Sequence, residues 1–248
     1  MWKLTILLLW LAVPICGYYF YRADYARYEQ DCQAQRQDCH LRADIVQRYA
    51  VYYDRQAQQI ADVTDRYTQR DWNRAWSRLQ DAMELERKAI RSSPPLYFPQ
   101  ADETLNASEQ ALADQQQAGE QAMKQRGFAL ELEKGLADLE DSIYQMRMAS
   151  EYYRREGSAS VYYLFQEQLA QFEAAYYTRM QEHNMFLDNS RSDLAKERRL
   201  SRDAQQATAL LDEKLKLDEK RTYQDQLRQR FAKFNLGEQL SRLLSRVV

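Results

Sequence analysis

Two cysteines near the start of the chain have the clearest capacity for covalent chemistry. Cys32 and Cys39 are seven residues apart, so on one helix their Cα atoms lie roughly 10 Å apart. A disulfide needs a Cα separation of about 4.4–6.8 Å, so the two do not bridge to each other on an intact helix. In an oxidising compartment, each could pair with its counterpart in a parallel dimer. The alternative is two small apolar residues that fill a helix interface.

The sequence offers no other arrangement typical of catalysis or of metal binding. His40 follows Cys39, but it points about 100° away on a helix, which argues against a zinc site. His183, the second of the two histidines, falls in an apolar stripe and is typical of a core residue. No motif places a nucleophile beside a base or forms a glycine-rich phosphate loop. We therefore predict no catalytic residue, no metal ligand and no cofactor, and a protein that is not an enzyme.

The composition predicts an all-α protein. The 248 residues include only six glycines and four prolines, and there is no glycine or proline between Tyr18 and Ser93. Sheet proteins need frequent turns that draw on these residues, whereas this chain is rich in the good helix formers Ala, Gln, Leu, Glu, Arg and Lys. The net charge of −2 gives no reason to expect a basic face, so nucleic acid is not an expected partner.

The first 21 residues predict a membrane anchor. The run from Leu4 to Tyr21 has no charged residue, and as a helix it would span roughly 27 Å, close to the thickness of the hydrocarbon core. Aromatic residues stand at both ends, as in helices that cross a bilayer. One alternative is a signal peptide cleaved after Gly17, and another is a lipoprotein modified at Cys16. We expect a single-pass protein of a bacterial inner membrane whose body lies in the periplasm, or a secreted or periplasmic protein after cleavage.

The rest of the chain predicts long antiparallel coiled-coil helices that form an elongated three-helix bundle. Pro94, Pro95 and Pro99 mark the clearest break, and Gly157 marks a second. The expected segments are a transmembrane helix over 1–21, a first long helix over 22–92, a proline-rich turn over 93–101, a second helix over 102–156, a third over 159–234 with a bend at 188–192, and a short amphipathic helix over 238–248.

Two helix faces predict binding surfaces. A seven-residue spacing predicts a seam for self-association in a parallel homodimer, formed by Tyr25, Cys32, Cys39, Val46, Tyr53, Ile60 and Tyr67. The amphipathic C-terminal segment predicts a face that caps the bundle, docks on a partner or touches lipid, formed by Leu236, Leu240, Leu243, Leu244 and Val247.

Tyrosine is abundant, with 18 residues and five adjacent pairs. Two adjacent residues on a helix cannot both face one narrow seam, so we expect one ring of each pair in the seam and the other at its flank. The flanking rings would contact a further helix of the bundle or a partner protein.

These features together favour a membrane-anchored helical scaffold or adaptor of a bacterial cell envelope that acts by protein–protein interaction. The alternatives are a secreted or periplasmic helical chaperone, and a periplasmic sensor or immunity protein that binds one partner.

Overall fold

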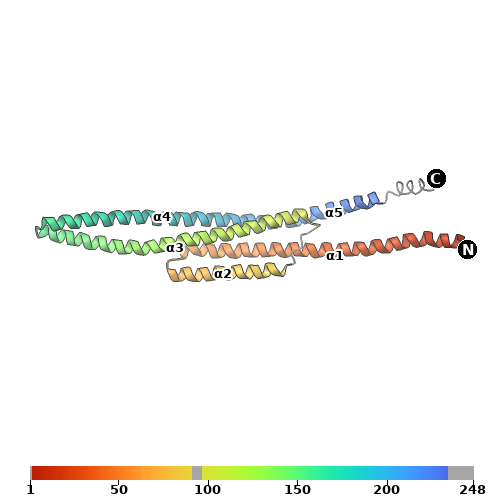
Figure 1. Ribbon diagram of the computed structural model, residues 1–248, viewed down its shortest axis with the longest axis horizontal. Coiled ribbons are helices and arrows are strands. Elements are labelled where there is room, and N and C mark those ends of the chain that lie inside the picture. Colours follow the sequence, from red (N-terminus) through yellow and green to blue (C-terminus); the bar gives the residue numbers. More distant parts are fainter. Residues whose placement is uncertain (1, 91–96, 234–248) are drawn as a thin grey trace. The chain divides into compact units, whose positions relative to one another are not determined.

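The computed structural model of the protein describes the backbone of residues 2–90 and 97–233. Side chains are described for residues 19, 22–23, 25–90, 97–222 and 225. Every regular element in this part is helical, which confirms the all-α class (Figure 1). The elements are α1 (Trp2–Gln58), the 3₁₀ helix η1 (Gln59–Asp62), α2 (Arg66–Ala89), α3 (Pro99–Arg155), α4 (Ala159–Ala209) and α5 (Leu211–Lys233).

The chain divides into two compact units. The first unit comprises Met1–Ile45, Arg87–Ser108 and Gln206–Val248, and the second comprises Val46–Glu86 and Glu109–Gln205. Among the helices whose side chains are described, none combines the length and the apolarity needed to cross a bilayer. In the expected membrane segment over residues 1–21, the structure describes the backbone from Trp2 and the side chain of Tyr19 alone.

The single helix expected over residues 22–92 is wrong. The chain leaves the α-helix at Gln58, passes through η1, becomes extended at Val63, and starts α2 at Arg66. Asp65 caps the new helix, because its Oδ1 accepts the backbone N–H of Thr68 at 2.8 Å. This turn uses a capping aspartate and two β-branched residues in place of glycine or proline, so the glycine–proline criterion missed it.

Helix α2 folds back along the end of α1 (Figure 1). Trp72 donates its indole N–H to the carbonyl oxygen of Gln56 at 2.8 Å. Trp76 packs its ring on that of Tyr53, with centroids 4.7 Å apart, and the two indoles stack at the same separation. The burial of these large rings stabilises the reversal without a regular turn motif.

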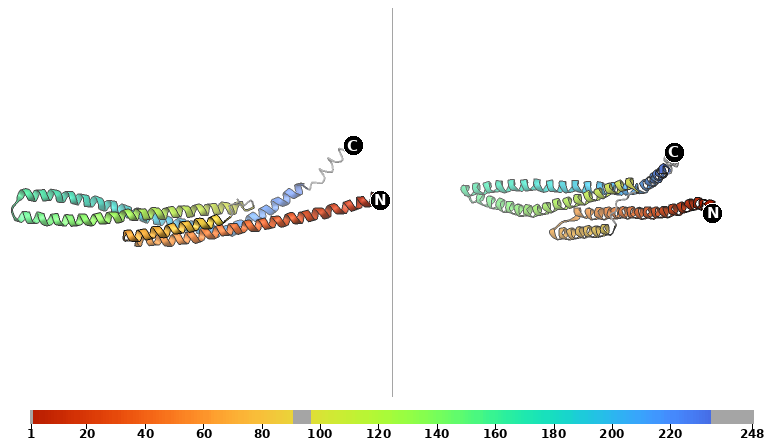
Figure 2. Two further views of the ribbon diagram at one scale, coloured as in Figure 1. Left: turned by 60° about the horizontal axis from the view of Figure 1, so that its bottom comes forward. Right: turned by 45° about the vertical axis from the view of Figure 1, so that its right-hand side comes forward.

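Helices α3 and α4 form an antiparallel hairpin, which Figure 2 shows from two further sides. The turn lies at Gly157, where the sequence predicted a break, and its φ of +73° suits glycine. Within the second unit, the two helices continue beyond the end of α1 and the start of α2, where Arg66 pairs with Glu131 of α3 at 3.0 Å (Figure 1). The part beyond this ion pair is taken as residues 132–183. We call this part of the second unit the hairpin arm.

Two further helix boundaries differ from the prediction. Residues 188–192, where a bend was expected, are helical, and the hydroxyl of Ser190 donates to the carbonyl oxygen of Ala122 on α3 at 2.9 Å. The break lies instead at Leu210, between α4 and α5. Helix α3 begins at Pro99, because a proline in the first helical turn has no backbone N–H to leave unpaired. The short helix expected over 238–248 lies outside the described residues.

In the first unit, α5 closes the start of α3. The Asp218 carboxylate accepts the backbone N–H groups of Gln100 and Ala101 at 2.9 and 3.0 Å, so it caps α3 from another helix. The hydroxyl of Thr222, one turn later, donates to the carbonyl oxygen of Tyr97 at 3.1 Å. This arrangement holds the segment after the proline-rich turn against α5.

Candidate functional sites

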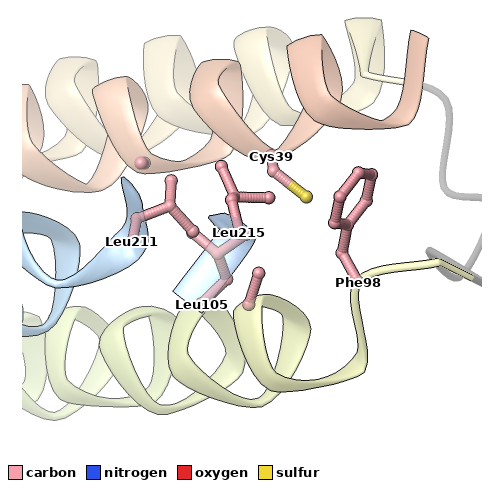
Figure 3. Close-up of a cluster of buried hydrophobic side chains, with 7 residues drawn as sticks. Cys39, Phe98, Leu105, Leu211 and Leu215 are labelled. Atoms are coloured by element: carbon pink, nitrogen blue, oxygen red, sulfur yellow. The ribbon is translucent and has the colours of Figure 1, made fainter. Parts of the chain in front are cut away.

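The cysteine pair lies in the first unit and is largely enclosed by the chain itself. Cys39 is 2% exposed and packs with Phe98, which directly precedes α3, with Leu105 of α3 and with Leu215 of α5 (Figure 3). Burial raises the pKa of its thiol to about 11, and burial also raises the pKa of the half-buried Cys32 thiol. Both thiols are therefore protonated at neutral pH, which makes them poor nucleophiles.

The predicted self-association seam is mostly occupied by the chain's own helices. Four of its seven residues are buried, namely Cys39, Val46, Tyr53 and Ile60. Tyr25 is exposed, and Tyr67 is exposed on α2, which runs back along α1. A second copy could reach the buried seam residues only if these cores opened. The parallel homodimer and its intermolecular disulfide stay predictions, and Cys32 is the thiol with the better access.

The two histidines make contacts with carboxylates. His40 lies 3.7 Å from Asp212 on α5, and His183 lies 3.1 Å from Glu133 across the base of the hairpin arm. Among the residues with described side chains, no group of three or more His, Cys, Asp or Glu could hold a metal ion.

The predicted C-terminal docking face, Leu236, Leu240, Leu243, Leu244 and Val247, lies outside the described residues.

The second unit contains a polar centre that the sequence did not reveal. Glu197 on α4 is 0% exposed, and its Oε1 accepts the side-chain N–H of Gln115 on α3 at 2.7 Å. The same Gln115 nitrogen donates to the carbonyl oxygen of Ala50 on α1 at 2.9 Å, and Ser201 donates to that oxygen at 3.3 Å. The centre thus joins three helices.

Two oxygens of this centre are buried without a hydrogen-bond partner, Glu197 Oε2 and Gln115 Oε1. Burial raises the pKa of the Glu197 carboxyl to about 7; the hydrogen bond from Gln115 and the charge of Arg198 lower it, and Asp54 raises it. A protonated Glu197 can donate a hydrogen bond, whereas a carboxylate only accepts. Because the carboxyl is closed to solvent, it suits a role in helix packing and not in substrate chemistry.

A shallow cleft of about 290 Å³ lies beside the stacked indoles, between α2 and α3. Glu120 on α3 accepts the indole N–H of Trp76 at 3.3 Å and also the side-chain N–H of Gln80. Gly119 lets the two helices approach, since a Cβ at this position would overlap the Trp76 ring. The cleft is lined by Gln69, Trp72, Asn73, Trp76, Ser77, Gln80, Glu120, Met123 and Lys124.

The hairpin arm carries a group of large exposed hydrophobic side chains. Its inner seam contains Leu139 and Ile143 of α3 and Leu169 of α4, all of which are buried. The exposed side chains are Tyr144, Met148 and Tyr152 on α3 and Tyr163, Leu164 and Tyr177 on α4. Aromatic rings that are open to solvent at this density are typical of surfaces that bind other proteins.

The exposed tyrosines of the arm follow a pattern that is visible in the sequence. The tyrosine pairs predicted that one ring of each would stand outside the seam, and the arm confirms it, since Tyr163 and Tyr177 are exposed while Tyr162 and Tyr176 are half-buried. The Glu197 centre was missed. The sequence pattern that could have revealed this centre is the spacing of Ser190, Glu197, Ser201 and Ala204, which places small and polar residues on one helix face.

Comparison of the chain with protein-family models, with curated protein sequences and with solved structures finds no match.

Proposed function

We propose that this chain is a membrane-anchored helical scaffold or adaptor of a bacterial cell envelope that acts by protein–protein interaction. The observation that carries the proposal is the set of exposed aromatic and aliphatic side chains on the hairpin arm. Tyr163 and Tyr177 on α4 are 69% and 65% exposed. They are fourteen residues apart, which is nearly four helical turns, so they share one face.

This α4 face has the chemistry of a protein-binding surface. A tyrosine ring buries a large apolar area while its hydroxyl keeps a hydrogen bond, which is why tyrosine is enriched where proteins meet. The seam between α3 and α4 does not need these rings, because Phe165, Leu169 and Tyr176 of α4 already face it. Their exposure therefore leaves them free for a partner protein.

The anchor and the finer architecture belong to the same proposal. The uncharged run from Leu4 to Tyr21 supports a single-pass segment in the inner membrane, with the body in the periplasm. The antiparallel α3–α4 hairpin supports long coiled-coil helices that form an elongated bundle. An anchored chain of this kind would bring its partner to the membrane without chemistry of its own.

Site-specific photo-crosslinking in cells tests the proposal. A photoreactive phenylalanine derivative at Tyr163 or Tyr177 should give one discrete crosslinked product in the membrane fraction, whose partner mass spectrometry identifies. The matched control places the same group at Gln168, an exposed polar position of the same helix. Equal crosslinking at Gln168, or no crosslinking at either tyrosine, would contradict the proposal. Many products of different mass, from a chain found in the soluble fraction, would favour a chaperone instead.

A further inference from the structure

The outer face of α3 in the hairpin arm carries a second exposed stripe, distinct from the α4 face. Tyr144, Met148 and Tyr152 are spaced four residues apart and are 65%, 57% and 58% exposed. Their neighbours Ile143 and Ser150 are buried towards α4, where Gln166 donates to the Ser150 hydroxyl. The helical period therefore places the stripe on the side of α3 that faces away from α4.

The order of residue types in the stripe is the same in both directions along α3. A tyrosine stands four residues before Met148 and another stands four residues after it. If two copies of α3 pair antiparallel about a two-fold axis at Met148, the two methionines meet and each Tyr144 lies against Tyr152 of the other copy. A two-fold interface uses the same patch on both chains, and this palindrome makes the patch match itself in antiparallel register. Methionine sulfur also makes favourable contacts with aromatic rings.

The charges beside the stripe match the same alignment. Asp141 lies three residues before Tyr144, and Arg155 lies three residues after Tyr152, so the antiparallel pairing brings each Asp141 to Arg155 of the other copy. Both side chains are exposed. A parallel pairing would instead place Asp141 against Asp141 and Arg155 against Arg155, which is unfavourable. The charges therefore select the antiparallel direction.

Both charged residues are available for a contact between copies. No ion pair of Asp141 occurs among the side chains that the structure describes. Arg155 shares the Glu151 carboxylate with Arg154, at 3.3 and 2.7 Å respectively. If Arg155 turns to a second copy, Glu151 keeps its shorter ion pair with Arg154, so the rearrangement leaves no charge alone.

We propose that the outer face of α3 binds the same face of a second copy of this chain, in an antiparallel contact centred on Met148 and closed at each end by an Asp141–Arg155 ion pair. A fully covered aromatic side chain buries about 150–250 Å², so the three side chains offer roughly 400 Å² per copy. A standard interface buries about 800 Å² per partner, so this contact is weak and forms at high protein concentration. It does not rest on the function proposed above, which uses the α4 face.

Crosslinking through single cysteines tests the alignment. The full-length chain, with Cys16→Ser, Cys32→Ser and Cys39→Ala, receives Met148→Cys or Tyr144→Cys and is treated, at high protein concentration, with a bis-maleimide about 8 Å long. Met148→Cys should give a covalent dimer. Tyr144→Cys alone should not, since its two copies lie roughly 12 Å apart along the axis, but a mixture with Tyr152→Cys should. Absence of the Met148→Cys dimer, or efficient crosslinking of Tyr144→Cys to itself, overturns the proposal.

A charge exchange tests the ion pairs in the Met148→Cys background. Asp141→Arg alone and Arg155→Asp alone each place like charges opposite one another at both ends, and each should lower the association constant about tenfold. The double variant restores opposite charges and should recover the dimer yield. Circular dichroism is the control and should give the same helix content for each variant. If the double variant is no better than the single variants, the antiparallel alignment is refuted.

Discussion

The buried carboxyl of Glu197 makes the free energy of unfolding of the chain depend on pH. Its pKa is about 7 in the folded chain against 4.5 for an ordinary glutamate, because burial disfavours the charged form. Between pH 4.5 and pH 7 the folded state holds a proton that the unfolded state has released. The stabilisation associated with this carboxyl is therefore complete below pH 4.5, falls as the pH rises, and is lost above pH 7.

The size of this pH effect follows from the difference between the pKa of Glu197 in the folded chain and that of an ordinary glutamate. Each pKa unit corresponds to about 1.4 kcal/mol, so the charged carboxylate costs the folded chain about 3 kcal/mol at pH 8 relative to pH 4.5. In Glu197→Gln no charge has to be buried. The new amide can accept the N–H of Gln115 and donate to Gln115 Oε1, which has no partner in the wild type. We expect the variant to be more stable than wild type by about 2–3 kcal/mol at pH 8 and nearly equal at pH 4.5.

Urea unfolding followed by circular dichroism, at pH 4.5, 6, 7 and 8, measures this difference. Glu167→Gln, at an exposed position of the same helix, is the matched control and should not change the pH dependence relative to wild type. Glu197→Ala should destabilise the chain by about 2–4 kcal/mol at pH 4.5, because it opens a cavity and leaves the Gln115 amide without its acceptor. At pH 8 this destabilisation should be smaller by about 3 kcal/mol, because only wild type then has to bury a charge. The reasoning is refuted if the free energies of unfolding of Glu197→Gln and wild type differ by the same amount at pH 4.5 and pH 8.

Three further predictions address the packing. Gly119→Ala should lower the free energy of unfolding by about 1–3 kcal/mol, because its Cβ would overlap the Trp76 ring. Gly135→Ala should be neutral or stabilising by up to about 1 kcal/mol, because the Cβ there meets only a flexible arginine side chain. Thermal unfolding compares the two variants, and equal effects would contradict the overlap. Asp218→Ala should cost about 1–2 kcal/mol and speed hydrogen exchange at the first turn of α3, and unchanged exchange there would contradict the capping role. In a Cys16→Ser chain, a maleimide should label Cys32 well before Cys39, and similar rates would argue against the buried position of Cys39.

The helical class followed from the sequence because glycine and proline are few and helix formers are many, and the hairpin turn followed because only glycine suits its positive φ. The break after α1 did not follow. It is held by contacts far apart in the chain, among them the hydrogen bond from the Arg126 guanidinium to the carbonyl oxygen of Val63 at 3.0 Å. A local pattern contains no information about a donor that lies 63 residues away.

The seam was assigned to self-association because a local pattern also does not show which distant residues cover a helix face. A seven-residue spacing predicts that a helix face is covered, but it does not identify the helix that covers it. Cys39 meets Leu211 and Leu215, which lie more than 170 residues further along the chain. The Glu197 centre was missed for a related reason, because its partner Gln115 is 82 residues away and a lone glutamate on a helix usually faces water.

The tyrosine pairs allow exposed residues of the surface to be predicted from the sequence. Adjacent residues on a helix point about 100° apart, so a pair of large rings supplies one ring to the seam and leaves the other outside it. Tyr153 stacks on Phe165 across the hairpin, with centroids 5.4 Å apart, while Tyr152 is exposed. In a three-helix arm, a further helix would cover the outer ring. In the described part of the chain, the arm has only two helices, so the outer rings of α3 and α4 remain exposed. The two faces proposed here for binding therefore both include the outer ring of a tyrosine pair, placed where no third helix of the described part packs.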